Sequence, residues 1–129
     1  MATSHKKIEV PSAPSSALYS QAIAANGFLF IAGQVPLDVA TGKLVEGGII
    51  EQTKQAFSNL EEILKGASLK LSDLVRVEIY LKDIRDLKMV NSIYLEIMTQ
   101  TIKPVRQAMQ VGNLPFESLI EVSGIAVIH

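Results

Sequence analysis

Hydrophobic residues at helical spacing predict two amphipathic helices in this chain of 129 residues. Between positions 49 and 67, apolar or small residues recur at steps of three and four, which marks one face of a helix. Gly66 lies where this helix should end. A second helix is expected to follow a capping aspartate, Asp83 or Asp86, and to run to about Met98. Its expected inward residues are Val90, Ile93, Tyr94 and Ile97.

Shorter apolar runs predict three strands near the N-terminus. Residues 6–10 form the first, and the runs 22–25 and 28–33 are joined by Asn26-Gly27. Asn-Gly supplies the two positive φ angles of a type I′ turn, so these two runs are predicted to form a β-hairpin. The second run is apolar on both faces, which is typical of a strand inside a sheet.

Three more strands are predicted in the second half of the chain. Residues 74–81 alternate between apolar and polar types, so the apolar set should face the core. That set is Val75, Val77, Ile79 and Leu81. Residues 105–111 form another strand, and 119–128 form the last, which is apolar almost throughout.

The order β-ββ-α-β-α-ββ predicts an α+β fold, a mixed six-stranded sheet with residues 1–129 forming one domain. Two helices do not suffice to cover both faces of such a sheet, so we expect both to pack on one face. Hydrophobic residues make up 48% of the chain and charged residues only 19%. The uncovered face should therefore be apolar, which favours a homo-oligomer of this chain.

Charge and composition narrow the possible partners. The net charge is −1 and the positive charges are scattered, so nucleic acid is an unlikely ligand class. No run reaches the length of a membrane span, and no membrane partner is expected. Cysteine is absent, which excludes disulfides and thiol catalysis. The polar N-terminus has no secretory pattern, so a cytoplasmic location is expected.

The histidines narrow the possible chemistry. His5 and His129 are the only two, and both lie near a chain end. Such residues are usually solvated, and without Cys or a central His the common nucleophile–base pairs cannot be built. No HExxH, DxDxDG, GxGxxG or GxxxxGK[ST] pattern occurs. We therefore expect no metal and no cofactor, and chemistry that depends on Arg, Lys, carboxylate, hydroxyl and backbone groups.

Arg106 is the leading candidate for ligand binding. It follows a proline at the start of an apolar strand, and no acid lies between Glu96 and Glu117. A guanidinium presents a rigid fork of donors that matches a carboxylate or phosphate. The alternative is a surface arginine, or one paired structurally with a distant acid. Ala108 should share its strand face, where a small side chain leaves space beside the guanidinium.

Glu121 is the second candidate, because it interrupts an apolar strand where an acid is costly unless it is paired or reached by water. It would either form an ion pair with Arg106 or Arg76, or orient and deprotonate a water molecule. Gly33 closes an interior strand and would let a ligand approach the backbone, or else serve tight packing. Tyr19 is an aromatic hydroxyl in a loop, suited to a core, an interface or a site.

Taken together, these residues resemble the RidA (YjgF/YER/L-PSP) family of reactive intermediate deaminases over nearly the whole chain. The combination of Pro-x-Arg, the Gly-Gln pair and the final Ile-Glu strand is specific, whereas each alone would be weak. The matching motifs are Ala13-Pro14, Tyr19 to Ala22, Ile31 to Gln34 with Pro36, Thr41-Gly42, Gln55-Ala56, Val75 to Asp83, Val90-Asn91 with Tyr94, Pro104 to Arg106, Leu114-Pro115, and Ile120-Glu121 with Ile125 to Val127.

The resemblance implies a chorismate-mutase-like fold that assembles as a homotrimer, with ligand clefts between subunits. It implies that Arg106 clamps the carboxylate of a 2-imino acid, that Glu121 positions water, that Gly33 contributes backbone and that Tyr19 closes the pocket. It implies hydrolysis of 2-iminobutanoate or 2-iminopropanoate to the 2-oxo acid and ammonia. The chain departs from common family residues at Ala17-Leu18, Ala32, Leu87, Val105 and Ala108.

Two other functions stay open from the sequence. One is an endoribonuclease acting on single-stranded RNA, the activity in the family's older L-PSP name. The other is a non-catalytic sensor that binds 2-oxo acids, or a chaperone-like trimer that uses the same clefts. The near-neutral net charge and the lack of a histidine pair or metal motif argue against the endoribonuclease.

Overall fold

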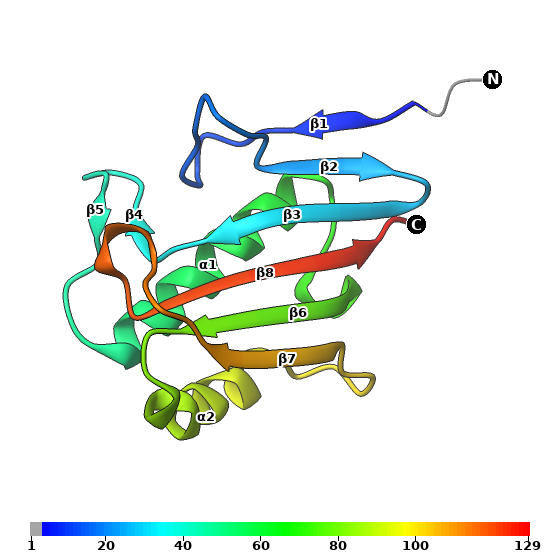
Figure 1. Cartoon of the computed structure of the whole chain (residues 1–129). Helices are drawn as coiled ribbons and strands as arrows, with labels where there is room; N and C mark the ends of the chain where they lie inside the picture. Colours follow the sequence, from blue (N-terminus) through cyan, green and yellow to red (C-terminus); the bar gives the residue numbers. More distant parts are fainter. Residues whose placement is uncertain (1–3) are drawn as a thin grey trace.

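The computed structural model describes residues 4–129, which build one six-stranded sheet in the order β1-β2-β3-β8-β6-β7 (Figure 1). Strands β6 and β7 run parallel, and every other neighbouring pair in this sheet is antiparallel. The predicted mixed sheet is therefore confirmed. The six strands are β1 (Lys6–Ile8), β2 (Ala22–Ala25), β3 (Phe28–Gln34), β6 (Leu74–Leu81), β7 (Val105–Gln110) and β8 (Ile120–Val127).

Both predicted helices are present, α1 (Ile49–Gly66) and α2 (Leu87–Ile97). Helix α1 lies behind β3 and β8 in Figure 1, and α2 packs against α1 next to the β7 edge. None of the helices in residues 4–129 has the length and apolarity needed to cross a membrane. The remaining elements are short: β4 (Leu37–Asp38), β5 (Lys43–Leu44), and the 3₁₀ turns η1 (Leu71–Asp73), η2 (Ile84–Asp86) and η3 (Pro115–Glu117).

The predicted apolar stripe of α1 forms the centre of the core. Thr53, Phe57, Leu60 and Leu64 are all buried, and the Phe57 ring meets the Tyr94 ring of α2 edge-on at 6.0 Å between centroids. Burying an aliphatic or aromatic side chain of this size stabilises the fold by about 1.5–3 kcal/mol. This stripe therefore fixes α1 against the sheet and α2 against α1.

The hairpin prediction is confirmed in detail. Asn26 and Gly27 have φ angles of 53° and 81°, and the two flanking strands pair antiparallel from Ala22 with Ile31 to Ala25 with Phe28. Strand β1 is shorter than predicted and ends at Ile8. Beyond it, the Val10 amide donates to Gln21 Oε1 at 2.7 Å, so a side chain has replaced the neighbouring strand as the hydrogen-bond partner.

The predicted inward set of β6 is wrong at one residue. Val77, Ile79 and Leu81 are buried, but Val75 is 38% exposed and Leu74 is buried in its place. The register of β6 against β8 shifts between Leu74 and Arg76, so Val75 is the extra residue of a β-bulge. A bulge turns the strand locally and reverses the faces that simple alternation predicts.

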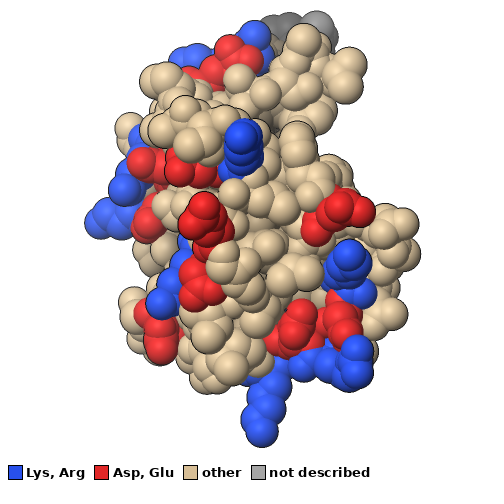
Figure 2. Space-filling model, turned by 90° about the vertical axis from the view of Figure 1, so that its left-hand side faces the viewer, with Lys and Arg blue, Asp and Glu red and all other residues tan. Residues whose placement is uncertain are grey.

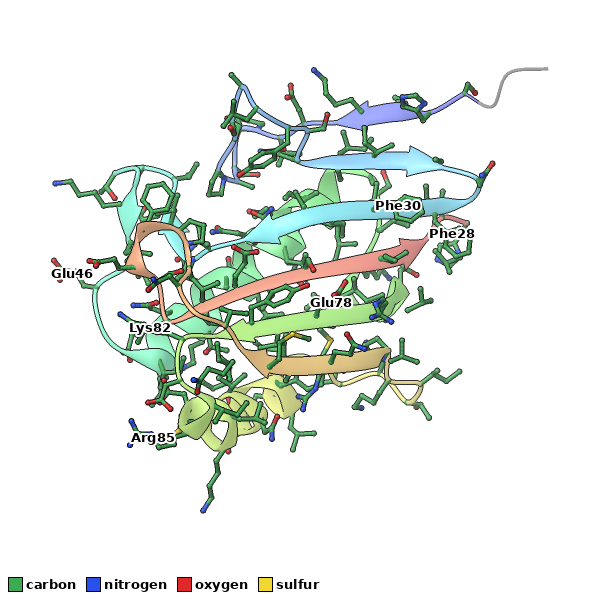
Figure 3. The ribbon with its side chains drawn as sticks, in the orientation of Figure 1. Phe28, Phe30, Glu46, Glu78, Lys82 and Arg85 are labelled. Carbon is green, nitrogen blue, oxygen red and sulfur yellow. The ribbon has the colours of Figure 1, made fainter. Side chains whose placement is uncertain are left out.

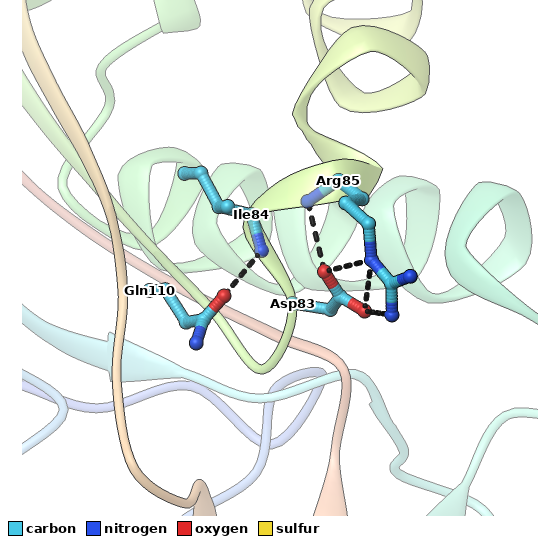
Figure 4. A network of polar contacts seen from close by, with 4 residues as sticks. All are labelled: Asp83, Ile84, Arg85 and Gln110. Atoms are coloured by element: carbon cyan, nitrogen blue, oxygen red, sulfur yellow. Dashed lines mark hydrogen bonds and ion pairs between the residues drawn. The ribbon is translucent and has the colours of Figure 1, made fainter.

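The second helix begins directly after Asp86, one of the two predicted caps, which occupies the N-cap position without a side-chain hydrogen bond. Asp83 caps the η2 turn by accepting from the Arg85 amide at 2.9 Å, and α2 proper begins at Leu87. Figure 4 shows that Asp83 also holds the Arg85 guanidinium and that Gln110 Oε1 accepts from the Ile84 amide at 2.9 Å. This last bond ties the end of β7 to the η2 turn that precedes α2.

The sheet face opposite the helices is open and carries both apolar and polar side chains. Phe28 and Phe30 project from β3 on this face and are 41% and 45% exposed (Figure 3). Its polar residues include Glu78, which pairs with Arg76 at 3.5 Å. The predicted uncovered face is therefore present in the protomer and exposes apolar side chains, but its central strands β6 and β8 also carry polar residues.

Candidate functional site

Arg106 lies on the face of the sheet that the helices cover. Parallel pairing sets Arg106 beside Val77 of β6, whose side chain is fully buried under the helices. The guanidinium Nη1 donates to Asn91 Oδ1 of α2 at 2.8 Å, and its Cζ lies 4.9 Å from the centroid of the Tyr94 ring. Two neighbours from one helix thus fix the plane and direction of the guanidinium.

No carboxylate among residues 4–129 pairs with Arg106. A guanidinium carries five N–H donors, and Asn91 accepts from only one of its nitrogens. The rest of the fork is available to an anion. Ala108 follows two residues later on the same face, is half-buried and packs against the core. The structure therefore places Ala108 beside Arg106, as the alternation of the strand predicts.

Glu121 lies on the opposite, open face of the sheet. It pairs in register with Tyr80 of β6, whose side chain lies on that face, and its neighbours Ile120 and Val122 point into the core. Neither of the ion pairs that the sequence allowed is formed in the described part of the chain. Arg76 pairs with Glu78 instead, and Arg106 is turned away. Burial raises the pKa of the Glu121 carboxyl above its usual value.

A β-bulge places Gly33 directly against this carboxylate. The register of β3 against β8 shifts between Ile31 and Gln34, which leaves Ala32 and Gly33 opposite Ser123 alone. A Cβ added at Gly33 would overlap the Glu121 carboxylate. Gly33 therefore allows tight packing of the Glu121 side chain against the β3 backbone, and tight packing is one of the two roles that the sequence suggested for it.

Two cavities meet at Gly33 and Glu121. One has a volume of about 380 Å³, and Tyr19 of the N-terminal loop contributes to its wall. The other has a volume of about 500 Å³ and is lined by Tyr80 and other residues around the β8 strand. Tyr80 donates its hydroxyl to Glu78 at 2.7 Å, and this bond raises the pKa of Tyr80. Glu121 is therefore a half-buried acid that faces open volume.

These residues form two separate groups in one protomer. We call Arg106, Ala108, Asn91 and Tyr94 the Arg106 half-site, and Tyr19, Gly33, Tyr80 and Glu121 the Glu121 half-site. Arg106 and Glu121 lie on opposite faces of the sheet, and neither cavity at Glu121 includes Arg106. The sequence named the main residue of each group but missed Asn91, Tyr94 and Tyr80 as site residues. The signal for Asn91 and Tyr94 was their spacing of three on one helix, which places both beside the same neighbour.

The side-chain amides of Gln21 and Gln52 are buried and hold the loops of the Glu121 half-site, a role that was not predicted from the sequence. Gln21 donates to the carbonyls of Val10, Ala13 and Pro14 at 2.9–3.1 Å, which fixes the loop that carries Tyr19. Gln52 of α1 accepts from the Leu119 amide at 2.8 Å, just before β8. These bonds set the position of the loop and the strand around Glu121. No cluster of three or more His, Cys, Asp or Glu residues suited to a metal occurs within residues 4–129.

Comparison with known proteins agrees with this architecture. A family model described as Endoribonuclease L-PSP matches residues 10–128. This chain belongs to the RidA (YjgF/YER/L-PSP) family. Within the family, a RutC family protein of Pyrococcus horikoshii is 46% identical over 108 residues, which cover 84% of this chain and 85% of that protein.

Two further family members are similar over nearly the full length. A mouse protein named 2-iminobutanoate/2-iminopropanoate deaminase is 41% identical over 123 residues, covering 95% of this chain and 90% of its own. A crystal structure of a Rid family protein from Yersinia pestis superposes with a TM-score of 0.94 at 36% identity, covering 97% of this chain and 100% of that one. The RidA fold expected from the sequence is thus the observed fold.

Proposed function

We propose that this protein hydrolyses 2-imino acids such as 2-iminobutanoate and 2-iminopropanoate to 2-oxo acids and ammonia. The observation that carries the proposal is that one chain provides two complementary groups. Arg106 is oriented by α2 and has no carboxylate partner in the described residues, and Glu121 is a half-buried acid without an ion-pair partner beside open volume. The first group suits a substrate carboxylate and the second suits a water molecule. The activity named for the mouse relative supports the same reaction.

We propose that the site is completed between subunits of a homotrimer. Arg106 and Glu121 lie on opposite sheet faces, so a small ligand cannot touch both within one protomer. The open face also leaves apolar side chains in solvent, among them Phe28, Phe30 and Met109. A second copy seated on this face would cover them and bring its own Arg106 toward Glu121.

In this mechanism Arg106 of one subunit holds the substrate carboxylate and so fixes the imine carbon. Glu121 of its neighbour accepts a proton from water as the water oxygen attacks that carbon, and gives this proton to the imine nitrogen, which yields the carbinolamine. Glu121 then carries the hydroxyl proton of the carbinolamine to the same nitrogen. The C–N bond breaks as the C=O bond forms, and ammonia and the 2-oxo acid leave. Burial favours this role, because a carboxyl with a raised pKa is a better proton acceptor than an ordinary glutamate.

The endoribonuclease named in the family description is the alternative function. Proteins that bind RNA electrostatically present a positive field along the backbone path. Figure 2 shows lysine, arginine, aspartate and glutamate interspersed on the face that includes the β4–β5 end, with no field of one sign. We therefore prefer the deaminase, and a 2-oxo acid sensor without turnover is left as an outcome of the assay.

A coupled assay tests the proposal. An L-amino acid oxidase generates the imine in place, and release of the 2-oxo acid is followed with wild type, Arg106→Ala and Arg85→Ala. Losing the bonds of Arg106 to a charged group should lower kcat/KM at least about tenfold. Arg85, whose side chain is 88% exposed and paired with Asp83, is the matched control and should have no effect. Wild-type protein that binds 2-oxo acids without speeding hydrolysis would point to the sensor.

A further inference from the structure

Phe116 has an unusual backbone conformation beside the Glu121 half-site. Its φ and ψ angles are 61° and 15°, and the next residue, Glu117, also has a positive φ of 56°. Non-glycine residues enter this left-handed region at a cost in free energy, and such residues concentrate at ligand sites. Two successive non-glycine residues with positive φ angles therefore suggest that this turn has a functional role.

The fold holds this segment from both sides. The Ser118 amide donates to the Pro115 carbonyl at 3.1 Å, and Gln52 accepts from the Leu119 amide at 2.8 Å. The constrained turn leaves the Phe116 side chain out of the hydrophobic core and 62% exposed. The ring instead lines the same 380 Å³ cavity as Glu121. The local strain thus presents an aromatic side chain to the cavity.

The remaining wall of this cavity is also largely apolar. Leu18, which is 91% exposed, lines it, together with Leu37 and Pro115. An exposed leucine alone needs no explanation. A leucine and a strained phenylalanine therefore line one cavity together with an unpaired acid and a few other polar residues. A mainly apolar wall with a few polar groups is the usual composition of a small-molecule site.

We infer that Phe116 and Leu18 form a side-chain subsite that selects 2-imino acids with large apolar side chains. This inference rests on the proposed function. The imine carbon has three substituents: Arg106 takes the carboxylate, and the nitrogen leaves. The third is the substrate side chain, which is directed into the rest of the cavity. A volume of 380 Å³ equals the liquid volume of about thirteen water molecules, more than the methyl group of an alanine-derived imine requires.

The test compares imines made in place from alanine, leucine and phenylalanine. Wild type should show the highest kcat/KM for the leucine or phenylalanine imine. Phe116→Ala should reduce that value by about tenfold, the lower end of what apolar pocket contacts provide, and leave the alanine imine within about twofold. Phe116→Gly is the second variant, because glycine adopts the positive φ without strain and still removes the ring. Leu95→Ala is the control, since Leu95 is similarly exposed at 66% but lines no cavity described at Glu121.

A binding measurement separates this inference from the reaction. Titration calorimetry of pyruvate, 4-methyl-2-oxopentanoate and phenylpyruvate should show affinity that increases with side-chain size, and the increase should vanish in both Phe116 variants. If the imines are not hydrolysed but the affinity series holds, the proposed function fails and the subsite stands. If wild type prefers the alanine imine, or if the Phe116 variants change all substrates and ligands equally, the subsite is overturned.

Discussion

The two half-sites fix their charged groups in opposite ways. Arg106 lies on an edge strand and is held by two side chains of one helix, Asn91 and Tyr94. Glu121 lies on an interior strand and has no ion-pair partner in the described chain, with Gly33 of a bulged neighbour against its carboxylate. The cation is thus oriented by contacts, whereas the acid is tuned by burial, which raises its pKa. Orientation suits binding and a raised pKa suits proton transfer.

Replacing the acid should give the largest effect. Glu121→Gln keeps the shape of the side chain but cannot accept a proton from water, so kcat should fall by about a hundredfold or more. Binding of a 2-oxo acid should change little, because Arg106 is intact. Turnover assays and calorimetry on the same preparation measure both. If kcat were unchanged, Glu121 would not be the proton acceptor, and the division of binding and proton transfer between the two half-sites would be wrong.

The same variant should alter two pH profiles. The wild-type rate should rise with pH as the Glu121 carboxyl ionises, through a pKa that burial raises above that of an ordinary glutamate. Because this pKa is raised by folding, the native state holds the proton longer than the unfolded chain, and stability contributed by Glu121 declines as pH rises through that window. Glu121→Gln should remove both effects, as rate profiles and chemical denaturation at several pH values would show.

Mixing subunits should give the next largest effect and tests whether the half-sites meet across a boundary. In trimers assembled from equal amounts of Glu121→Gln and Arg106→Ala chains, about a quarter of the clefts should pair an intact Arg106 with an intact Glu121. Co-expression should therefore restore activity to about a quarter of wild type. If both residues served within one protomer, the mixture would give only the mean of the two inactive variants.

Much of the fold followed from the sequence because its signals are local. The stripe of α1 and the Asn26-Gly27 turn each depend on neighbouring residues, and both are observed. The predicted inward orientation of Val75 was wrong because the alternation of residue types carries no information about a β-bulge, which depends on how β6 pairs with β8. The first strand was predicted two residues too long for a similar reason, because the Val10 amide bonds to the side chain of Gln21, 11 residues away in the sequence.

For the two half-sites as well, local features were predictable from the sequence and features that depend on strand pairing were not. Residue type identified Arg106 and Glu121, because an arginine fork and an acid in an apolar strand are rare enough to stand out. Their placement on opposite faces depends on the parallel pairing of β7 with β6 and could not be read from either strand alone. The role of Asn91 was hidden because an amide on a helix has many ordinary uses.

Gly33→Ala sharpens the comparison at the Glu121 half-site, with a smaller expected effect. The added Cβ meets only the flexible end of Glu121, so the fold should tolerate it, and the carboxylate should move. A displaced catalytic group loses rate, here by about tenfold in kcat. At Gly124 a Cβ would come within 3.0 Å of the Arg76 carbonyl oxygen, and that oxygen cannot move away. Gly124→Ala should therefore lower the melting temperature, whereas Gly33→Ala should not.

The smallest effect is expected at the Arg106 half-site. Asn91→Ala removes the 2.8 Å bond that orients the guanidinium but leaves its charge and its stacking on Tyr94. Arg106 should then reach the substrate carboxylate in several orientations, which raises KM a few-fold and changes kcat less, since Glu121 is untouched. Ser92→Ala, on the same helix and exposed, is the control and should leave both constants unchanged. A fall in kcat with constant KM would instead mean that Asn91 acts on the chemistry, and that orientation and proton transfer are not divided between the two half-sites.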